Sequence, residues 1–136
     1  MNYELEKLIV KRFPFMDRKC YPNTDFGYGG FDIPDGWFPL IVQFAKELDE
    51  IKPSDLVLFQ VKEKFNQLII CAECSGPEKD LLALDALEEN IEKLSFSLCG
   101  GCGEFLMPSH VCHPRSQNED ALIEWAALYL EDTNIA

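Results

Sequence analysis

Cys99-Gly100-Gly101-Cys102-Gly103 is the stretch that decides the fold, and His110-Val111-Cys112-His113 follows it at short range. Two cysteines lie three positions apart on a turn rich in glycine, a residue that lets backbone amides face the sulfur atoms. Such a pair grips a tetrahedral metal ion from one side, and a second ligand pair closes the site from the other. A knuckle, a short hairpin and a helix start, in that order, are typical of treble-clef zinc sites. We therefore predict a structural zinc site over residues 99–113.

The candidate metal ligands are Cys99, Cys102, Cys112, His110 and His113. Neighbouring residues rarely both reach one metal ion with good geometry. Cys112 is the first choice for the third ligand, because a thiolate adds most to a zinc site in a reducing cell. His110 and His113 are near-equal candidates for the fourth ligand. The alternative is a set of buried thiols with two incidental histidines.

Cys71-Ala72-Glu73-Cys74 is a second C-x-x-C pair. It could join Cys99 and Cys102 in a four-cysteine site. Cys71 lies in strand-like sequence that lacks the glycine a knuckle favours, so we expect core thiols there. A redox role for either pair would need a thiol at a helix N-terminus, and no convincing helix follows Cys99-x-x-Cys102.

Apolar periodicity outside the knuckle predicts four helices. They run from Glu4 to Phe13, from Trp37 to Glu50, from a capping box at 75–78 to Leu94, and from a cap at 116–119 to Glu131.

Alternating apolar residues between Leu56 and Cys74 predict a β-hairpin with its turn at Asn66-Gln67. In the first arm we expect Phe59, Val61 and Phe65 on one face. The predicted fold class is α+β, a small antiparallel hairpin packed by about four helices, in a single domain over residues 1–136.

An irregular stretch over residues 15–35 is rich in aromatic residues and glycine. Its candidate partner-binding side chains are Tyr21, Phe26, Tyr28 and Phe31. Such a stretch either presents an apolar patch to a partner or folds back as a lid on the core.

The chain is acidic, with a net charge of −12 over 136 residues. This charge opposes direct binding to phosphate backbones and would attract a basic protein partner, although it also serves solubility alone. We find no apolar run of membrane-spanning length and no signal-peptide pattern, and therefore expect a cytoplasmic protein.

Three features together resemble a group of small uncharacterised proteins often encoded in bacteriophage and prophage genomes. They are Gly36-Trp37 at a helix start, the strand Val61-Lys62-Glu63-Lys64-Phe65, and a C-x-x-C with a later Cys/His pair. In that group the turn after the strand is usually two glycines and the last ligands have a Cys-x-x-His pattern, whereas this chain has Asn66-Gln67 and His110-Val111-Cys112-His113. The resemblance implies zinc binding by Cys99, Cys102 and Cys112 in a bacterial host cell, and it implies no activity.

Catalytic motifs such as H-E-x-x-H, a glycine-rich phosphate loop and G-x-S-x-G do not occur in the sequence. The first hypothesis is therefore an interaction protein, one that inhibits a basic host protein concerned with nucleic-acid handling or defence. An enzyme with an open zinc site of three protein ligands and a water is the second hypothesis. A nucleic-acid-binding zinc protein is the third and weakest, because Arg115 is the only basic residue near the cysteines.

Overall fold

The computed structural model describes residues 1–17 and 31–131 of the chain. In this part of the protein four α-helices pack with one two-stranded antiparallel sheet, which is an α+β fold as predicted. The helices are α1 (Tyr3–Arg12), α2 (Phe38–Ile51), α3 (Glu78–Ser95) and α4 (Glu119–Glu131). The strands are β1 (Val57–Lys64) and β2 (Gln67–Glu73), and short 3₁₀ turns lie at Pro14–Met16 (η1), Asp35–Trp37 (η3) and Arg115–Gln117 (η4).

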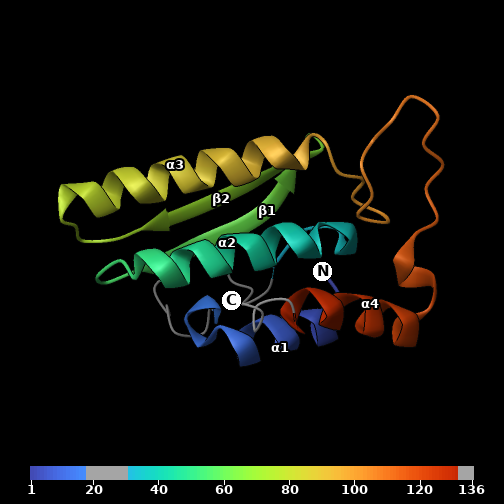
Figure 1. Ribbon diagram of the computed structural model, residues 1–136, viewed down its shortest axis with the longest axis horizontal. Helices are drawn as coiled ribbons and strands as arrows, with labels where there is room; N and C mark the ends of the chain where they lie inside the picture. Colours follow the sequence, from blue (N-terminus) through green and yellow to red (C-terminus); the bar gives the residue numbers. More distant parts are fainter. Residues whose placement is uncertain (18–30, 132–136) are drawn as a thin grey trace.

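Helix α2 lies at the centre of the molecule, between the hairpin with α3 on one side and the α1–α4 pair on the other (Figure 1). Its sequence is apolar around most of its circumference, so it is suited to burial on more than one face. Phe38, Ile41, Phe44 and Leu48 of α2 are all 1% exposed or less. No helix of the described residues is long and apolar enough to cross a membrane.

The two strands pair in register from Lys64 opposite Gln67 onward, with a bulge between Leu58 and Gln60. The predicted turn was misplaced by one residue. Phe65 and Asn66 form it with φ of 52° and 62°, the left-handed pair that a tight type I′ hairpin turn requires. Phe65 is therefore 88% exposed and does not share a face with the buried Val61, contrary to the prediction from the alternation, and Leu58 and Val61 are the buried residues of β1.

Side chains of α3 satisfy the outer edge of β2. Ser95 Oγ accepts a hydrogen bond from the Leu68 amide at 3.0 Å, and Glu88 Oε1 accepts one from the Ala72 amide at 3.1 Å. Burial raises the pKa of Glu88 to about 7, although its bond to the Ala72 amide lowers it. This arrangement closes an edge that would otherwise be open to pairing with another strand.

The predicted start of α3 needs correction, whereas the cap of α4 lies within the predicted range. Ser75 does not cap α3, because the residue that precedes the helix is Pro77 and no side chain caps it. The Ser75 hydroxyl instead lies 2.8 Å from Asp55 Oδ2. At the start of α4 the cap within 116–119 is Asn118, whose Oδ1 accepts from the Ala121 amide at 3.1 Å.

Candidate metal centre

Four side chains that offer metal-ligand atoms converge beside the end of α3. They are Cys99, Cys102, His110 and Cys112, and their ligand atoms all lie within 4.8 Å of one another. Cys102 Sγ and His110 Nε2 are 3.4 Å apart. A tetrahedral zinc ion with its usual bond lengths holds sulfur atoms about 3.8 Å apart and a sulfur and a nitrogen about 3.6 Å apart. The group therefore has the size of one metal site, and among the described residues it is the only such group.

The first two candidate ligands lie on a tight turn over residues 99–103, called the knuckle below, which an antiparallel bridge between Leu98 and Phe105 closes. The Cys99 amide donates to the Glu104 carbonyl at 2.8 Å, and the Gly103 amide donates to the Cys99 carbonyl at 2.8 Å. Gly103 has a φ of +78°, which a residue with a side chain rarely adopts. Backbone geometry thus places Cys99 and Cys102 on the same side of the turn.

Gly101 makes room for the third thiol. A Cβ at this position would collide with Cys112 Sγ and lie 3.7 Å from Cys99 Sγ. The Arg115 amide donates to the Gly101 carbonyl at 3.1 Å, and Arg115 Nε donates to the Cys102 carbonyl at 2.6 Å. These bonds hold the returning chain, which carries His110 and Cys112, against the knuckle.

The thiols of Cys99 and Cys112 differ in their pKa values. For Cys99, burial raises the pKa, but hydrogen bonds from the Cys102 and Gly101 amides, His110 and Cys112 outweigh it and lower the pKa to about 6. For Cys112, the hydrogen bond to Cys99 raises the pKa to about 11. One thiolate thus forms readily, and a second negative charge beside it is opposed unless a cation is present.

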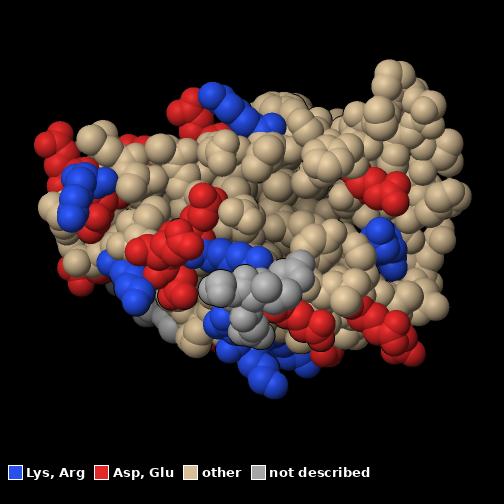
Figure 2. Space-filling view, viewed as in Figure 1, with Lys and Arg blue, Asp and Glu red and all other residues tan. Residues whose placement is uncertain are grey.

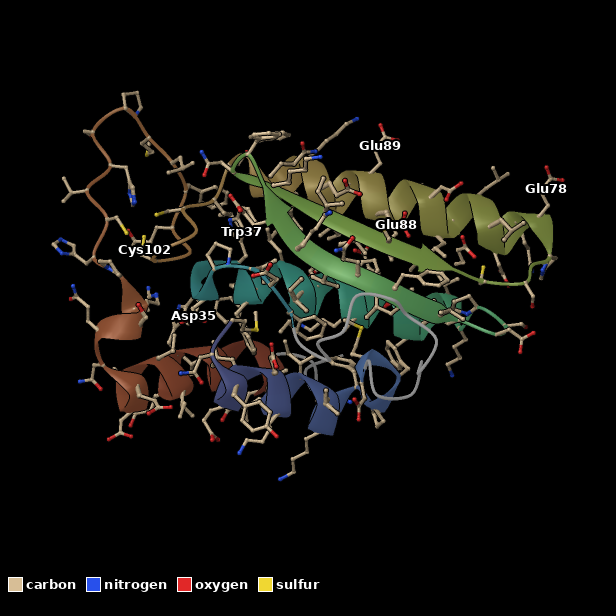
Figure 3. All side chains as sticks on the ribbon, turned by 180° about the vertical axis from the view of Figure 1, so that it is seen from behind. Asp35, Trp37, Glu78, Glu88, Glu89 and Cys102 are labelled. Atoms are coloured by element: carbon tan, nitrogen blue, oxygen red, sulfur yellow. The ribbon has the colours of Figure 1, made fainter. Side chains whose placement is uncertain are left out.

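The knuckle is anchored by η3, which lies far away in the sequence just before α2, and by α4 (Figure 3). At the start of α2, the Gly36 amide donates to the Gly100 carbonyl at 2.7 Å, and Trp37 Nε1 donates to the Leu98 carbonyl at 3.1 Å. On α4, the Trp125 ring packs beside Gly103, and the Arg115 guanidinium lies 4.4 Å from the centroid of that ring. The Gly36-Trp37 pair thus has a direct part in positioning the site.

Sequence reasoning singled out five candidate metal ligands, and the structure brings four of them together. His113 is exposed and is not part of the group. Cys71 and Cys74 are not part of it either, and the expectation of core thiols was wrong for Cys71, which is exposed, while Cys74 is half-buried against the core. Sequence reasoning missed the anchoring roles of Gly36, Arg115 and Trp125.

The aromatic partner-binding candidates divide into two groups. Tyr21, Phe26 and Tyr28 lie outside the described residues. Phe31 is 4% exposed and belongs to the core, so it cannot present its ring to a partner. Its amide donates to Glu6 Oε1 at 2.7 Å, which holds this end of the segment on α1. For Phe31, the lid alternative is the one that the structure supports.

Comparison of the chain with protein-family models, with curated proteins and with solved structures gave no significant match. The function is therefore argued from the site itself.

Proposed function

We propose that Cys99, Cys102, His110 and Cys112 bind one zinc ion as a structural centre. The observation that carries this proposal is the convergence of four ligand atoms within 4.8 Å. Three thiolates and one imidazole form a donor set that suits zinc, whereas magnesium and calcium prefer oxygen ligands. The three thiolates and the ion leave one net negative charge, and the guanidinium of Arg115 lies against the knuckle.

A structural role fits this centre better than a catalytic one. Four protein ligands fill a tetrahedral coordination sphere, so no position remains at which zinc could activate a water. The ion would join two segments, the knuckle that follows α3 and the chain that leads into α4. Zinc thereby ties the last helix to the body of the protein, and the binding free energy adds to folding stability.

A matched pair of histidine variants tests this proposal. His110→Ala removes one of the four proposed ligands, whereas His113→Ala removes an exposed imidazole three residues further along. We expect His110→Ala to lower zinc affinity at least tenfold. His113→Ala should leave the affinity unchanged. Competition with a colorimetric zinc chelator measures both affinities, and equal values for the two variants would contradict the ligand assignment.

We also propose that the protein acts by binding a basic protein partner rather than by catalysis. The support is a net charge of −12 and an acidic depression of about 410 Å³ beside α3. Asp85, Glu88, Glu89 and Glu92 line this depression, where Lys93 pairs with Glu89 at 3.0 Å and burial raises the pKa of Glu88 to about 7. Glu89 points outward from the helix (Figure 3). The resemblance to phage-encoded proteins favours a basic host protein concerned with nucleic-acid handling or defence as the partner.

Capture from bacterial lysate at low and high salt tests the partner proposal. A partner held by charge should bind at low ionic strength and elute when salt screens the interaction. The variant Asp85→Asn/Glu89→Gln removes two charges from the depression. The control Asp120→Asn/Glu124→Gln removes two exposed charges from α4. We expect only the first to lose the partner, and equal capture by both variants would count against the depression as the binding surface.

A further inference from the structure

The cysteines of the candidate metal centre differ in their access to solvent. Cys112 is exposed, Cys99 is half-buried and Cys102 is only 4% exposed. Cys112 belongs to the loop over residues 104–114, which projects from the body of the protein (Figure 1). A small oxidant dissolved in water therefore reaches the Cys112 sulfur before the other two.

Cys99 is placed to react with an oxidised Cys112. The Cys112 thiol donates a hydrogen bond to the Cys99 sulfur, so the two side chains are already in contact. Gly101 keeps the space between them open, because a Cβ there would collide with Cys112 Sγ and lie 3.7 Å from Cys99 Sγ. A disulfide requires the two sulfurs to close to about 2.05 Å. No side chain at position 101 prevents this approach.

Cys102 is a less suitable partner, although its side chain also contacts Cys112. Its sulfur is buried and lies 3.4 Å from His110 Nε2. Arg115 Nε donates to the Cys102 carbonyl at 2.6 Å, and this bond holds that end of the knuckle in place. The geometry therefore favours Cys99 as the residue that pairs with Cys112.

The loop that carries Cys112 has no charged side chain beyond Glu104. Residues 105–114 contain no Asp, Glu, Lys or Arg. Figure 2 shows an uncharged surface over the loop at the upper right, whereas acidic side chains occupy much of the remaining visible face. Attack of a thiolate on a neighbouring sulfur concentrates negative charge there, and adjacent carboxylates would oppose it. Residues 105–114 bring no carboxylate to this thiol.

We propose that Cys112 is an oxidation site at which a hydroperoxide generates a Cys99–Cys112 disulfide. The Cys112 thiolate attacks the peroxide, an S–O bond forms as the O–O bond breaks, and the departing oxygen takes a proton to give water or an alcohol. The Cys99 thiolate then attacks the Cys112 sulfur. An S–S bond forms as the S–O bond breaks, and the departing hydroxide takes a proton to give water. The two sulfurs lose two electrons, which the hydroperoxide gains.

The disulfide displaces the metal ion, a consequence that rests on the proposed metal centre. After oxidation only Cys102 and His110 remain as ligands, whereas a structural zinc site requires four. The new bond nevertheless keeps the knuckle joined to the chain that leads into α4. The oxidised protein is therefore free of zinc but still cross-linked between residues 99 and 112. A dithiol reductant reverses the step by thiol–disulfide exchange.

Hydrogen peroxide added to the zinc-loaded full chain tests this proposal. We expect release of one zinc ion per chain, measured with a colorimetric chelator, and uptake of zinc again after reduction. Cys71→Ser is the control, because it removes an exposed thiol that is not part of the group. This variant should release zinc at the native rate. Retention of zinc by the native chain, or loss of the release in Cys71→Ser, would overturn the proposal.

Peptide mapping identifies the bond. Cleavage after Lys93, Glu104 and Arg115 separates Cys112 from the two cysteines of the knuckle. Mass spectrometry of oxidised, zinc-free protein should show peptide 94–104 linked to peptide 105–115. Cys102→Ser should keep this linked pair, and Cys112→Ser should lose it. A linked pair that disappears in Cys102→Ser, a bond within peptide 94–104, or a sulfinic acid at Cys112 without a disulfide would overturn the proposal.

The two measurements separate this proposal from the metal proposal. Zinc-loaded protein that forms no disulfide removes the oxidation site and leaves the metal centre standing. Protein that never binds zinc but forms the Cys99–Cys112 disulfide removes the metal centre and leaves the oxidation site standing. Protein that neither binds zinc nor forms this disulfide contradicts both.

Discussion

Gly36→Ala probes the contact between the start of α2 and the knuckle. A Cβ built at Gly36 would lie 2.5 Å from the Cys99 carbonyl oxygen and 2.6 Å from the Gly100 carbonyl carbon. Both are backbone atoms of a closed turn, so no side chain can rotate away to relieve the collision. The knuckle and η3 must therefore separate, and the 2.7 Å hydrogen bond from the Gly36 amide to Gly100 is lost.

The expected cost follows from two contributions. Overpacking of a well-packed contact costs about 1–3 kcal/mol. Loss of the hydrogen bond costs about 1 kcal/mol more. Gly36→Ala should therefore lower the free energy of unfolding by about 2–4 kcal/mol and the melting temperature by about 8–16 °C for a domain of this size. Metal affinity should fall as well, because the displaced turn carries Cys99 and Cys102.

Thermal melting followed by circular dichroism, with and without added zinc, measures both effects. Gly76→Ala is the matched control. A Cβ at Gly76 would have no neighbour closer than 3.8 Å. Because Gly76 has a φ of +95°, the substitution should lower stability through backbone strain alone. It should lower stability modestly and leave zinc affinity unchanged. A Gly36→Ala protein with native melting temperature and native zinc affinity would refute the packing of the knuckle on η3.

Three further substitutions test individual contacts. Ser95→Ala leaves the buried Leu68 amide without its acceptor and should cost about 1–3 kcal/mol in urea unfolding, and an unchanged midpoint would contradict that contact. Trp37→Phe removes the indole bond to the Leu98 carbonyl and should cost about 1 kcal/mol in the same assay, whereas a larger loss would indicate that ring packing dominates. The pKa of Glu88 is about 7 in the folded protein, above the ordinary value of 4.5, so the folded state binds more protons and stability should fall as pH rises from 4.5 through 7. Glu88→Gln should remove this loss and stabilise the protein by about 1 kcal/mol at pH 8, a value reduced because the carboxyl is half-exposed. At pH 4 the variant should bring no gain in stability. An equal gain at both pH values would contradict the burial argument.

Local patterns predicted the elements of this fold well. Apolar periodicity placed the helix later assigned as α2 at Trp37 to Glu50, and the structure has it at Phe38–Ile51. Errors arose where a backbone angle or a distant contact decides. The hairpin turn was predicted one residue too late because Phe65 adopts a positive φ. Aromatic residues seldom adopt that conformation, so no sequence pattern indicated that Phe65 lies in the turn. Phe31 is buried by contacts with residues far away in the sequence, which a local pattern does not reveal.

The candidate site was predictable to the extent that its signals are local. The spacing of Cys99 and Cys102 indicated a shared site, and the structure brings both residues together with His110 and Cys112. The choice between His110 and His113 depends on the path of the loop, and both spacings are compatible with a fourth ligand. Gly36 and Trp125 pack on the knuckle from other parts of the chain, and a local sequence motif cannot predict such contacts.

The most direct test of the metal centre is the zinc content of the full chain purified under reducing conditions. We predict one zinc ion per chain by elemental analysis, together with a lower melting temperature after removal of the ion by a strong chelator. Recovery of the original melting temperature on addition of zinc, but not of magnesium, completes the prediction. Protein that carries no zinc, binds none when it is added, and melts identically with and without chelator would contradict the account.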